Sequence, residues 1–148
     1  MALPPLTEDG ELPIGVYATS LREVLERFGV GSAQRKALAL RLERVYSVAQ
    51  GTDHLGRFLV FGSFVTNKLE PQDVDVFPVM ADTFDAASLR GDALLLFDHG
   101  AAQAHFGASV FWVRHLAAWQ GEQAAVEFWQ VKRGGGRRGI VEIISEAS

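Results

Sequence analysis

The sequence predicts an α/β (α+β) domain, a small mixed β-sheet covered by helices. Two short apolar segments, 58–61 and 74–80, are rich in Val and Phe and typical of buried strands. Two segments with helical periodicity, 21–28 and 33–50, precede them and carry capping residues. The 148 residues, 48% of them hydrophobic, suit one domain with one sizeable core.

The N-terminal residues 1–18 are expected to form an extended arm that lies over the domain or stays loose. Three of the five prolines, Pro4, Pro5 and Pro13, fall there, and proline disfavours both a helix interior and a central strand. Residues 19–148 are then expected to form a single domain without an internal repeat or linker. The sequence therefore predicts one domain preceded by an arm.

The first helix begins with a capping box, in which Ser20 is followed three residues later by Glu23, and it is expected to stop at Gly29. Ser32 is the expected cap of a longer helix over 33–50. Helical spacing assigns its residues as follows: Leu38, Leu42, Val45 and Ala49 to the core, and Arg35, Arg41 and Arg44 to the water-facing side.

The strand at 58–61 ends at Gly62 and leads into a short turn or helical stub plus loop over 64–72. The strand at 74–80 follows, and Pro78 limits its pairing near the far end. Further along, the expected elements are a helix over 84–98 weakened by Gly91, a strand over 110–113, a helix over 122–131 broken at Gly134, and a last strand over 140–144.

Composition narrows the possible functions. The 14 basic and 18 acidic residues give a net charge of −4, so affinity for nucleic acid or an anionic membrane needs a local patch. The absence of cysteine excludes disulfides, zinc–thiolate sites and thiol nucleophiles. The apolar run 93–97 is too short to span a membrane, and the first residues do not look like a signal peptide. We expect a cytoplasmic protein without a membrane partner.

One segment carries recognisable chemistry. In Asp73-Val74-Asp75-Val76 the two carboxylates alternate with valines on a predicted strand, so both point to one face. Residues two apart on a strand are separated by about 6.6 Å, and carboxylates at that distance can converge on one or two divalent cations. Two such ions about 4 Å apart serve in-line phosphoryl or nucleotidyl transfer.

The preceding strand ends in Gly62-Ser63. Glycine lets backbone N–H groups approach a ligand closely, and serine adds a hydroxyl at the start of a helical turn, where anions are favoured. Lys68 lies in the loop that joins the two halves of the motif. An anion cradle beside a carboxylate pair suits a nucleoside triphosphate with Mg²⁺ or Mn²⁺.

This pattern resembles the nucleotidyltransferase superfamily that includes DNA polymerase β. The superfamily's hallmark is an apolar residue, Gly, then Gly or Ser, a gap, and Asp-apolar-Asp/Glu-apolar. Here Phe61-Gly62-Ser63 is followed by nine residues and then by Asp73-Val74-Asp75-Val76. More narrowly, residues 62–66 together with Lys68 and Pro71 are similar to a group of small, uncharacterised bacterial nucleotidyltransferase-like proteins.

The resemblance implies a role for each motif residue. Asp73 and Asp75 would bind the metal ions and be catalytic, Gly62 and Ser63 would hold the β- and γ-phosphates, and Lys68 would assist them. An acceptor hydroxyl would then attack the α-phosphate and release pyrophosphate. The acceptor could be a protein side chain, an RNA end or a small molecule, so nucleic acid is a partner only as acceptor.

Active members of the superfamily usually add a third carboxylate from a later strand, and Ser109 stands where that acid is expected. Asp98 and Glu142 are possible substitutes. A serine cannot act as a general base unaided at neutral pH. The alternative is therefore a catalytically weak or inactive binding module with a protein partner, such as one component of a toxin–antitoxin pair, or a sensor that binds nucleotide without turnover.

Other interpretations of the same residues stay open. Asp73 and Asp75 could lie on an edge strand and simply face water. Haloacid-dehalogenase-like phosphatases also use Asp-x-Asp, but Phe77 stands where they carry Thr or Val, and sugar-nucleotide glycosyltransferases usually need a larger domain. The basic residues Lys132, Arg133, Arg137 and Arg138 form either a solvated turn or a loop that meets a polyanion.

Overall fold

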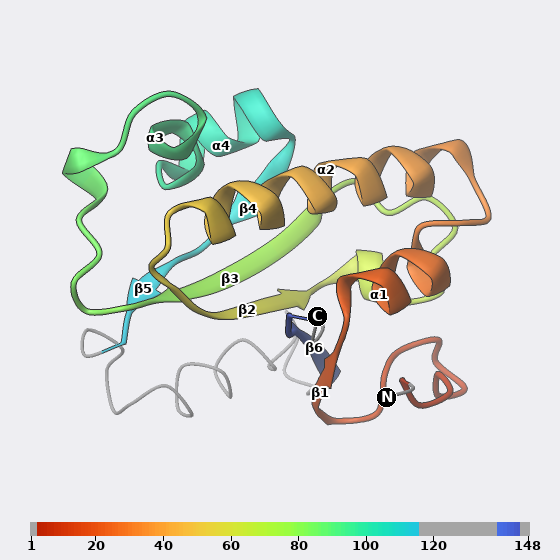
Figure 1. The fold of residues 1–148 in the computed structure, drawn as a ribbon. Coiled ribbons are helices and arrows are strands. Elements are labelled where there is room, and N and C mark those ends of the chain that lie inside the picture. Colours follow the sequence, from red (N-terminus) through yellow and green to blue (C-terminus); the bar gives the residue numbers. More distant parts are fainter. Residues whose placement is uncertain (1–2, 116–138, 146–148) are drawn as a thin grey trace.

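The computed structural model describes residues 3–115 and 139–145, and these form a mixed α/β structure, as the sequence predicts (Figure 1). The strands are β1 (Gly15–Thr19), β2 (Leu55–Phe61), β3 (Val74–Met80), β4 (Ala108–Val110), β5 (Val113–Arg114) and β6 (Gly139–Ile143). The helices are α1 (Leu21–Phe28), α2 (Ala33–Gly51), α3 (Asp92–Leu96) and α4 (His99–Phe106), with 3₁₀ turns η1 (Ser63–Val65) and η2 (Ala86–Ser88).

The described strands form one mixed sheet in the order β1-β6-β2-β3-β4. The central strand β2 runs antiparallel to both of its neighbours, β6 and β3. β1 is parallel to β6, and β4 is parallel to β3. β5 continues along the same side of β3, because it pairs with the residues at the far end of that strand. The chain therefore brings the end of β2 and the starts of β3, β4 and β6 to one end of the sheet.

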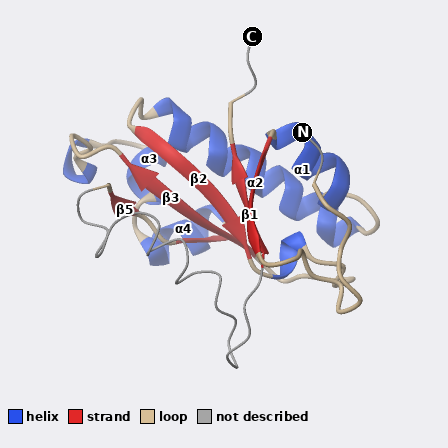
Figure 2. Ribbon diagram, turned by 90° about the horizontal axis from the view of Figure 1, so that it is seen from below, coloured by secondary structure: helices blue, strands red, loops and turns tan. Residues whose placement is uncertain are grey.

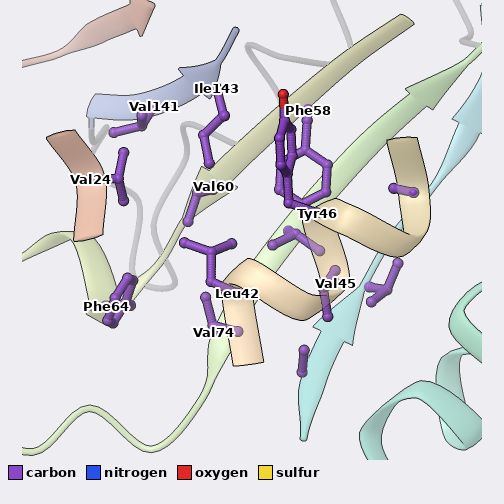
Figure 3. Close-up of a cluster of buried hydrophobic side chains, with 14 of the residues drawn as sticks. Val24, Leu42, Val45, Tyr46, Phe58, Val60, Phe64, Val74, Val141 and Ile143 are labelled. Atoms are coloured by element: carbon purple, nitrogen blue, oxygen red, sulfur yellow. The ribbon is translucent and has the colours of Figure 1, made fainter. Parts of the chain in front are cut away.

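The described helices cover one face of this sheet (Figures 1 and 2). α2 crosses β2, β3 and β4 and contributes Leu38, Leu42 and Val45, which are all fully buried. Figure 3 shows α2 side chains meeting side chains of the sheet. The sheet residues labelled there are Phe58, Val60, Val74, Val141 and Ile143. This apolar layer is the main core.

The opposite face of the sheet is also apolar along its centre. The residues of this second cluster are Leu59, Phe61, Phe77, Val79 and Ile140. Along β2 the side chains thus alternate between two buried layers, and all four residues of 58–61 are buried. The prediction of a strand buried on both faces is confirmed.

Both predicted helix caps are present. Ser20 Oγ accepts a hydrogen bond from Glu23 N at 3.1 Å, and Ser32 Oγ accepts one from Arg35 N, also at 3.1 Å. The Glu23 carboxylate accepts hydrogen bonds from the Thr19 hydroxyl and from Leu3 N. The Thr19 hydroxyl is the main reason that the pKa of Glu23 lies below its ordinary value. Glu23 thereby ties the N-terminal arm to the start of α1.

The arm lies over the domain. Leu3 and Leu12 are buried in the main core, at 8% and 3% exposure. Residues 15–18, expected to belong to the arm, instead form β1 together with Thr19, and β1 is an edge strand of the sheet. They pair there because β6, a segment more than 100 residues away in the sequence, offers a free edge.

The segment 84–115 differs most from its prediction. A helix over 84–98 is wrong: only η2 and α3 form there, because Gly91 adopts a left-handed φ of 62° that interrupts the helix. The helix α4 was not predicted, and Asp98 caps it by accepting from Ala101 N. The strand expected over 110–113 is instead two shorter strands, β4 and β5.

The predicted helix over 122–131, its break at Gly134 and the basic residues Lys132, Arg133, Arg137 and Arg138 lie outside the described residues. Across 3–115 and 139–145, no helix is both long enough and apolar enough to cross a lipid bilayer.

The core layer beneath α2 makes a direct prediction. Leu42→Ala removes a fully buried side chain and leaves a cavity, so the free energy of unfolding should fall by about 2–5 kcal/mol. Leu40→Ala is the matched control on the same helix, because Leu40 is 68% exposed and its truncation should change stability by no more than about 0.5 kcal/mol. Urea denaturation followed by circular dichroism measures both, and equal losses would contradict this core.

Candidate functional site

The two motif halves meet at one end of the sheet. In the sheet register Asp75 lies opposite Phe61 of β2 on one side and opposite Ser109 of β4 on the other. Gly62 directly follows Phe61, and Asp73 directly precedes β3. These pairings make Gly62 a neighbour of the two carboxylates. They also bring in Ser109, which stands where the sequence led us to expect a third acid.

Gly62 and Asp75 are in close contact. A Cβ atom at position 62 would lie only 2.2 Å from Asp75 Oδ2. Gly62 also has a φ of 82°, in the left-handed region that side chains other than glycine rarely adopt. Glycine is required here both for the sharp turn out of β2 and for the approach of the Asp75 carboxylate to the backbone.

Asp73 is held by two hydrogen bonds. Its Oδ1 accepts from Val74 N at 2.9 Å, and its Oδ2 accepts from Ser109 Oγ at 2.5 Å. Ser109 is only 6% exposed, and its Oγ accepts in turn from Gln103 Nε2 at 3.1 Å. This chain of donors orients the Asp73 carboxylate. Ser109 thus acts as a donor to Asp73, and its short hydroxyl stands where a third carboxylate was expected.

A cavity of about 300 Å³ adjoins Gly62 and contains the remaining predicted residues. Its lining includes Gly62, Ser63 and Lys68, all predicted to contact phosphates. The N-terminal arm forms another part of the wall, with Asp9 and Glu11. This volume lies at the lower end of the range of small-molecule sites, about 300–1,000 Å³.

The arm is fastened to this cavity by backbone contacts. Asn67 N donates to Gly10 O at 2.9 Å. Gly10 has a φ of 78°, and a Cβ there would lie 2.0 Å from Asn67 Oδ1, so the two loops touch without room for a side chain. At Gly139 a Cβ would lie 2.2 Å from Pro13 O. The acids of the arm therefore have a defined place at the cavity wall.

Arg35 holds the loop between η1 and β3. The expectation that Arg35 faces water is wrong, because its side chain is buried, at 6% exposure. Its five hydrogen bonds all go to backbone carbonyl groups: Nε to Lys68 O, Nη1 to Phe28 O and Phe64 O, and Nη2 to Thr66 O and Lys68 O, at 2.5–3.1 Å.

Five bonds are as many as the N–H groups of a guanidinium allow, so the Arg35 side chain is fully satisfied. No carboxylate pairs with it among the described residues, and burial lowers the pKa of Arg35 from its ordinary value. Burying the charged guanidinium costs several kcal/mol of desolvation free energy. The five hydrogen bonds offset this cost only while the carbonyl groups stay in place. Arg35 therefore fixes the path of the loop that carries Lys68.

The two other third-acid candidates have structural roles away from Asp73. Glu142 forms an ion pair with Arg57 at 2.7 Å. Its strand lies two strands from β3, about 10 Å at the usual strand spacing. Asp98 caps the start of α4, whereas Ser109 follows the end of that helix. Within the parts of the chain that the structure describes, no three His, Asp or Glu side chains are grouped to hold a metal ion.

Four residues contribute to this site without having been expected there from the sequence: Arg35, Gln103, Asp9 and Glu11. Arg35 lies in the first turn of a capped helix, where a charged residue usually faces solvent, so its sequence position does not indicate burial. Gln103 lies on a helix that was not predicted. The arm acids reach the cavity because the arm contacts Asn67 and continues into β1, which pairs with β6, and no local sequence pattern reveals these contacts.

The fold and the site together define an α/β domain with a carboxylate pair and a glycine–serine turn at one end of its sheet. The chain belongs to a family of unknown function, DUF6932, whose model matches residues 4–144. Comparisons with curated proteins and with solved structures give no match.

The contact between Gly62 and Asp75 can be tested by substitution. Gly62→Ala should destabilise the protein by about 1–3 kcal/mol, because it places a side chain in a left-handed conformation and against a carboxylate. Gly51→Ala is the control, since nothing lies within 4 Å of a Cβ there. Thermal denaturation measures the difference. A Gly62→Ala, Asp75→Ala double variant should regain part of the loss, and a purely additive result would contradict the contact.

Arg35→Lys keeps the charge but cannot reproduce a planar fork with five donors. We expect a loss of about 2–4 kcal/mol in stability, because backbone carbonyl groups lose their buried donor. We also expect faster hydrogen exchange at Asn67 N–H, which lies in the loop that Arg35 holds. NMR exchange rates test this, with Arg22→Lys on the exposed side of α1 as control; unchanged exchange at Asn67 would count against the role of Arg35.

Proposed function

We propose that this protein transfers a nucleoside monophosphate from a nucleoside triphosphate to an acceptor hydroxyl and releases pyrophosphate, with Mg²⁺ or Mn²⁺ as cofactor. The observation that carries the proposal is the convergence of both motif halves. Asp75 touches Gly62, and Gly62 lines one cavity with Ser63 and Lys68. The order and spacing of these residues resemble the nucleotidyltransferase superfamily, which supports the same conclusion.

The donor set suits the proposed ion. Asp73 and Asp75 offer carboxylate oxygens on one face of β3, and Mg²⁺ prefers oxygen ligands from one or two carboxylates together with substrate phosphates. Asp73 is already oriented by Ser109 Oγ and Val74 N. When bound, the ion would stabilise the negative charge that develops on the transferred phosphate.

The cavity beside Gly62 would receive the β- and γ-phosphates. Gly62 lets the phosphates approach the backbone closely, Ser63 adds a hydroxyl donor, and the exposed Lys68 adds a positive charge. Asp9 and Glu11 line the same cavity and would repel a free triphosphate. Such a wall favours a triphosphate that arrives as its metal complex.

In the proposed reaction the acceptor oxygen forms a bond to the α-phosphorus while the bond to the pyrophosphate oxygen breaks. The proton of the acceptor hydroxyl passes to water, since Ser109 occupies the place of a third carboxylate and is a donor to Asp73. Catalysis would then rest on positioning and on electrostatic stabilisation. We place this activity in the cytoplasm, where nucleoside triphosphates and Mg²⁺ are plentiful.

A second function is favoured by Ser109 itself. Without a third carboxylate at that position, the same site could bind a nucleotide weakly or not at all, and the domain would serve as a binding module for a protein partner. One component of a toxin–antitoxin pair is the example that the resemblance suggests. Asp98 and Glu142 support this alternative, because a helix cap and an ion pair already occupy them.

Label transfer tests the proposed reaction. The protein is incubated with α-labelled nucleoside triphosphates, Mn²⁺ or Mg²⁺ and a cell extract. Asp73→Asn and Asp75→Asn should each lower transfer by about 100-fold or more, because each removes a carboxylate that holds the ion. Asp82→Asn, an exposed acid beyond the far end of β3, is the control and should keep full transfer.

Calorimetry separates the two functions. The nucleotidyltransferase should bind Mn²⁺ and ATP together, and this heat should disappear in Asp75→Asn. If neither ligand binds, while the protein forms a stable complex with the product of a neighbouring gene, the binding-module function replaces the proposed one.

A further inference from the structure

A groove between α2 and α4 is not used by the proposed reaction. We call it the basic groove. It measures about 590 Å³, and its lining residues are Leu40, Arg41, Arg44, Gln103, Ala104, His105, Phe106 and Gly107. Among these residues there are two arginines and one histidine, and none is acidic. In a chain with a net charge of −4, this is a local excess of positive charge.

Arg41 lies against the turn after α4. Its Nη1 donates to Gly107 O at 3.4 Å, and the guanidinium occupies the space that a Cβ at Gly107 would need, at 2.9 Å. Of the five N–H groups of Arg41, four have no partner among the described residues. A half-buried guanidinium with unused donors at a groove wall is suited to an anion.

Arg44 is one helical turn further along α2 and shares a carboxylate with His105. Arg44 Nη2 lies 2.9 Å from Asp92 Oδ2, and His105 Nε2 lies 3.0 Å from Asp92 Oδ1. The hydrogen bonds from Arg44 and then His105 lower the pKa of Asp92. The Arg44 guanidinium also stacks over Phe106, 5.1 Å from the ring centroid. Asp92 thus competes with any anion for Arg44.

The basic groove adjoins the candidate site through Gln103. This groove residue donates to Ser109 Oγ at 3.1 Å, and Ser109 Oγ donates to Asp73 Oδ2 at 2.5 Å. Two hydrogen bonds therefore separate the wall of the groove from a carboxylate that would hold the metal ion. A molecule lying in the groove would contact Gln103, the residue through which the groove is linked to Asp73.

We propose that the basic groove binds phosphate-ester groups of the acceptor and directs the acceptor hydroxyl toward Asp73. This inference rests on the proposed function. Arg41 and Arg44 lie three residues apart on one helix, so their side chains are neighbours and can contact one phosphate or two successive ones. The phosphates belong either to a mononucleotide or to the end of a single-stranded oligonucleotide, which share this chemistry.

Binding of a fluorescently labelled single-stranded RNA oligonucleotide, measured by anisotropy without triphosphate, tests the groove. The Arg41→Gln, Arg44→Gln double variant should bind at least about tenfold more weakly. Its plot of log affinity against log salt should be shallower by about 0.7 if the arginines contact one phosphate and by about 1.4 if they contact two, since each lost phosphate contact on a single strand removes about 0.7. Asp92→Asn should bind more tightly than the unmodified protein, because a competing carboxylate is removed.

Arg22→Gln is the matched control: Arg22 is an exposed arginine of α1 that lines a different cavity, and its loss should leave affinity and salt slope unchanged. Circular dichroism checks that each variant folds. If unlabelled adenosine monophosphate displaces the labelled RNA from the groove, the acceptor is a mononucleotide. If only unlabelled oligonucleotides displace it, the acceptor is the end of a strand.

Equal losses in the groove variant and in Arg22→Gln would overturn the proposal, as would an RNA affinity too weak to measure together with no binding of adenosine monophosphate. Because this assay contains no triphosphate, its result is independent of metal–nucleotide binding at Asp73 and Asp75. If RNA binding depends on the groove but no label is transferred, the proposed nucleotidyl transfer is contradicted and the groove as an RNA-binding site still stands.

Discussion

The candidate site depends on one buried guanidinium. Arg35 of α2 donates every N–H group it has to backbone carbonyl groups, one at the end of α1 and the others in the loop over 64–68. These bonds join two helices to the connection between β2 and β3. A buried charge that is satisfied only by carbonyl groups stabilises one loop path, because any other path leaves the charge unsolvated. The cavity beside Gly62 has its shape for this reason.

Around this loop, glycines allow contacts at the end of the sheet that are too close for any residue with a side chain. Gly62 leaves room for the Asp75 carboxylate, and Gly10 leaves room for Asn67. In the proposed function three kinds of charged group then meet at this end of the sheet. Asp73 and Asp75 would hold a cation, Lys68 would meet phosphates, and the arm acids Asp9 and Glu11 would repel uncomplexed phosphates. The basic groove extends the same pattern to the other side of Asp73, through Gln103 and Ser109.

Features with a local physical cause could be predicted from the sequence. Ser20 and Ser32 cap their helices because a serine before an amphipathic segment can accept from the first-turn N–H groups. β3 has the bounds that its apolar pattern predicts, Val74–Met80. Ser109, expected from the sequence at the position of a third acid, lies beside the carboxylates because β4 pairs with β3. Non-local features could not be predicted. The pairing of β1 with β6 needs segments far apart in sequence, and the burial of Arg35 follows only once the loop over 64–68 is in place.

The central claim is that Asp73 and Asp75, with the turn at Gly62, form a metal–triphosphate site. Anomalous diffraction from a crystal grown with Mn²⁺ and a non-hydrolysable triphosphate analogue tests it most directly. Our account predicts an anomalous peak within about 2.2 Å of carboxylate oxygens of Asp73 and Asp75, with phosphate density against Gly62 and Ser63. A peak at another set of side chains, or an analogue bound away from this end of the sheet, would contradict it.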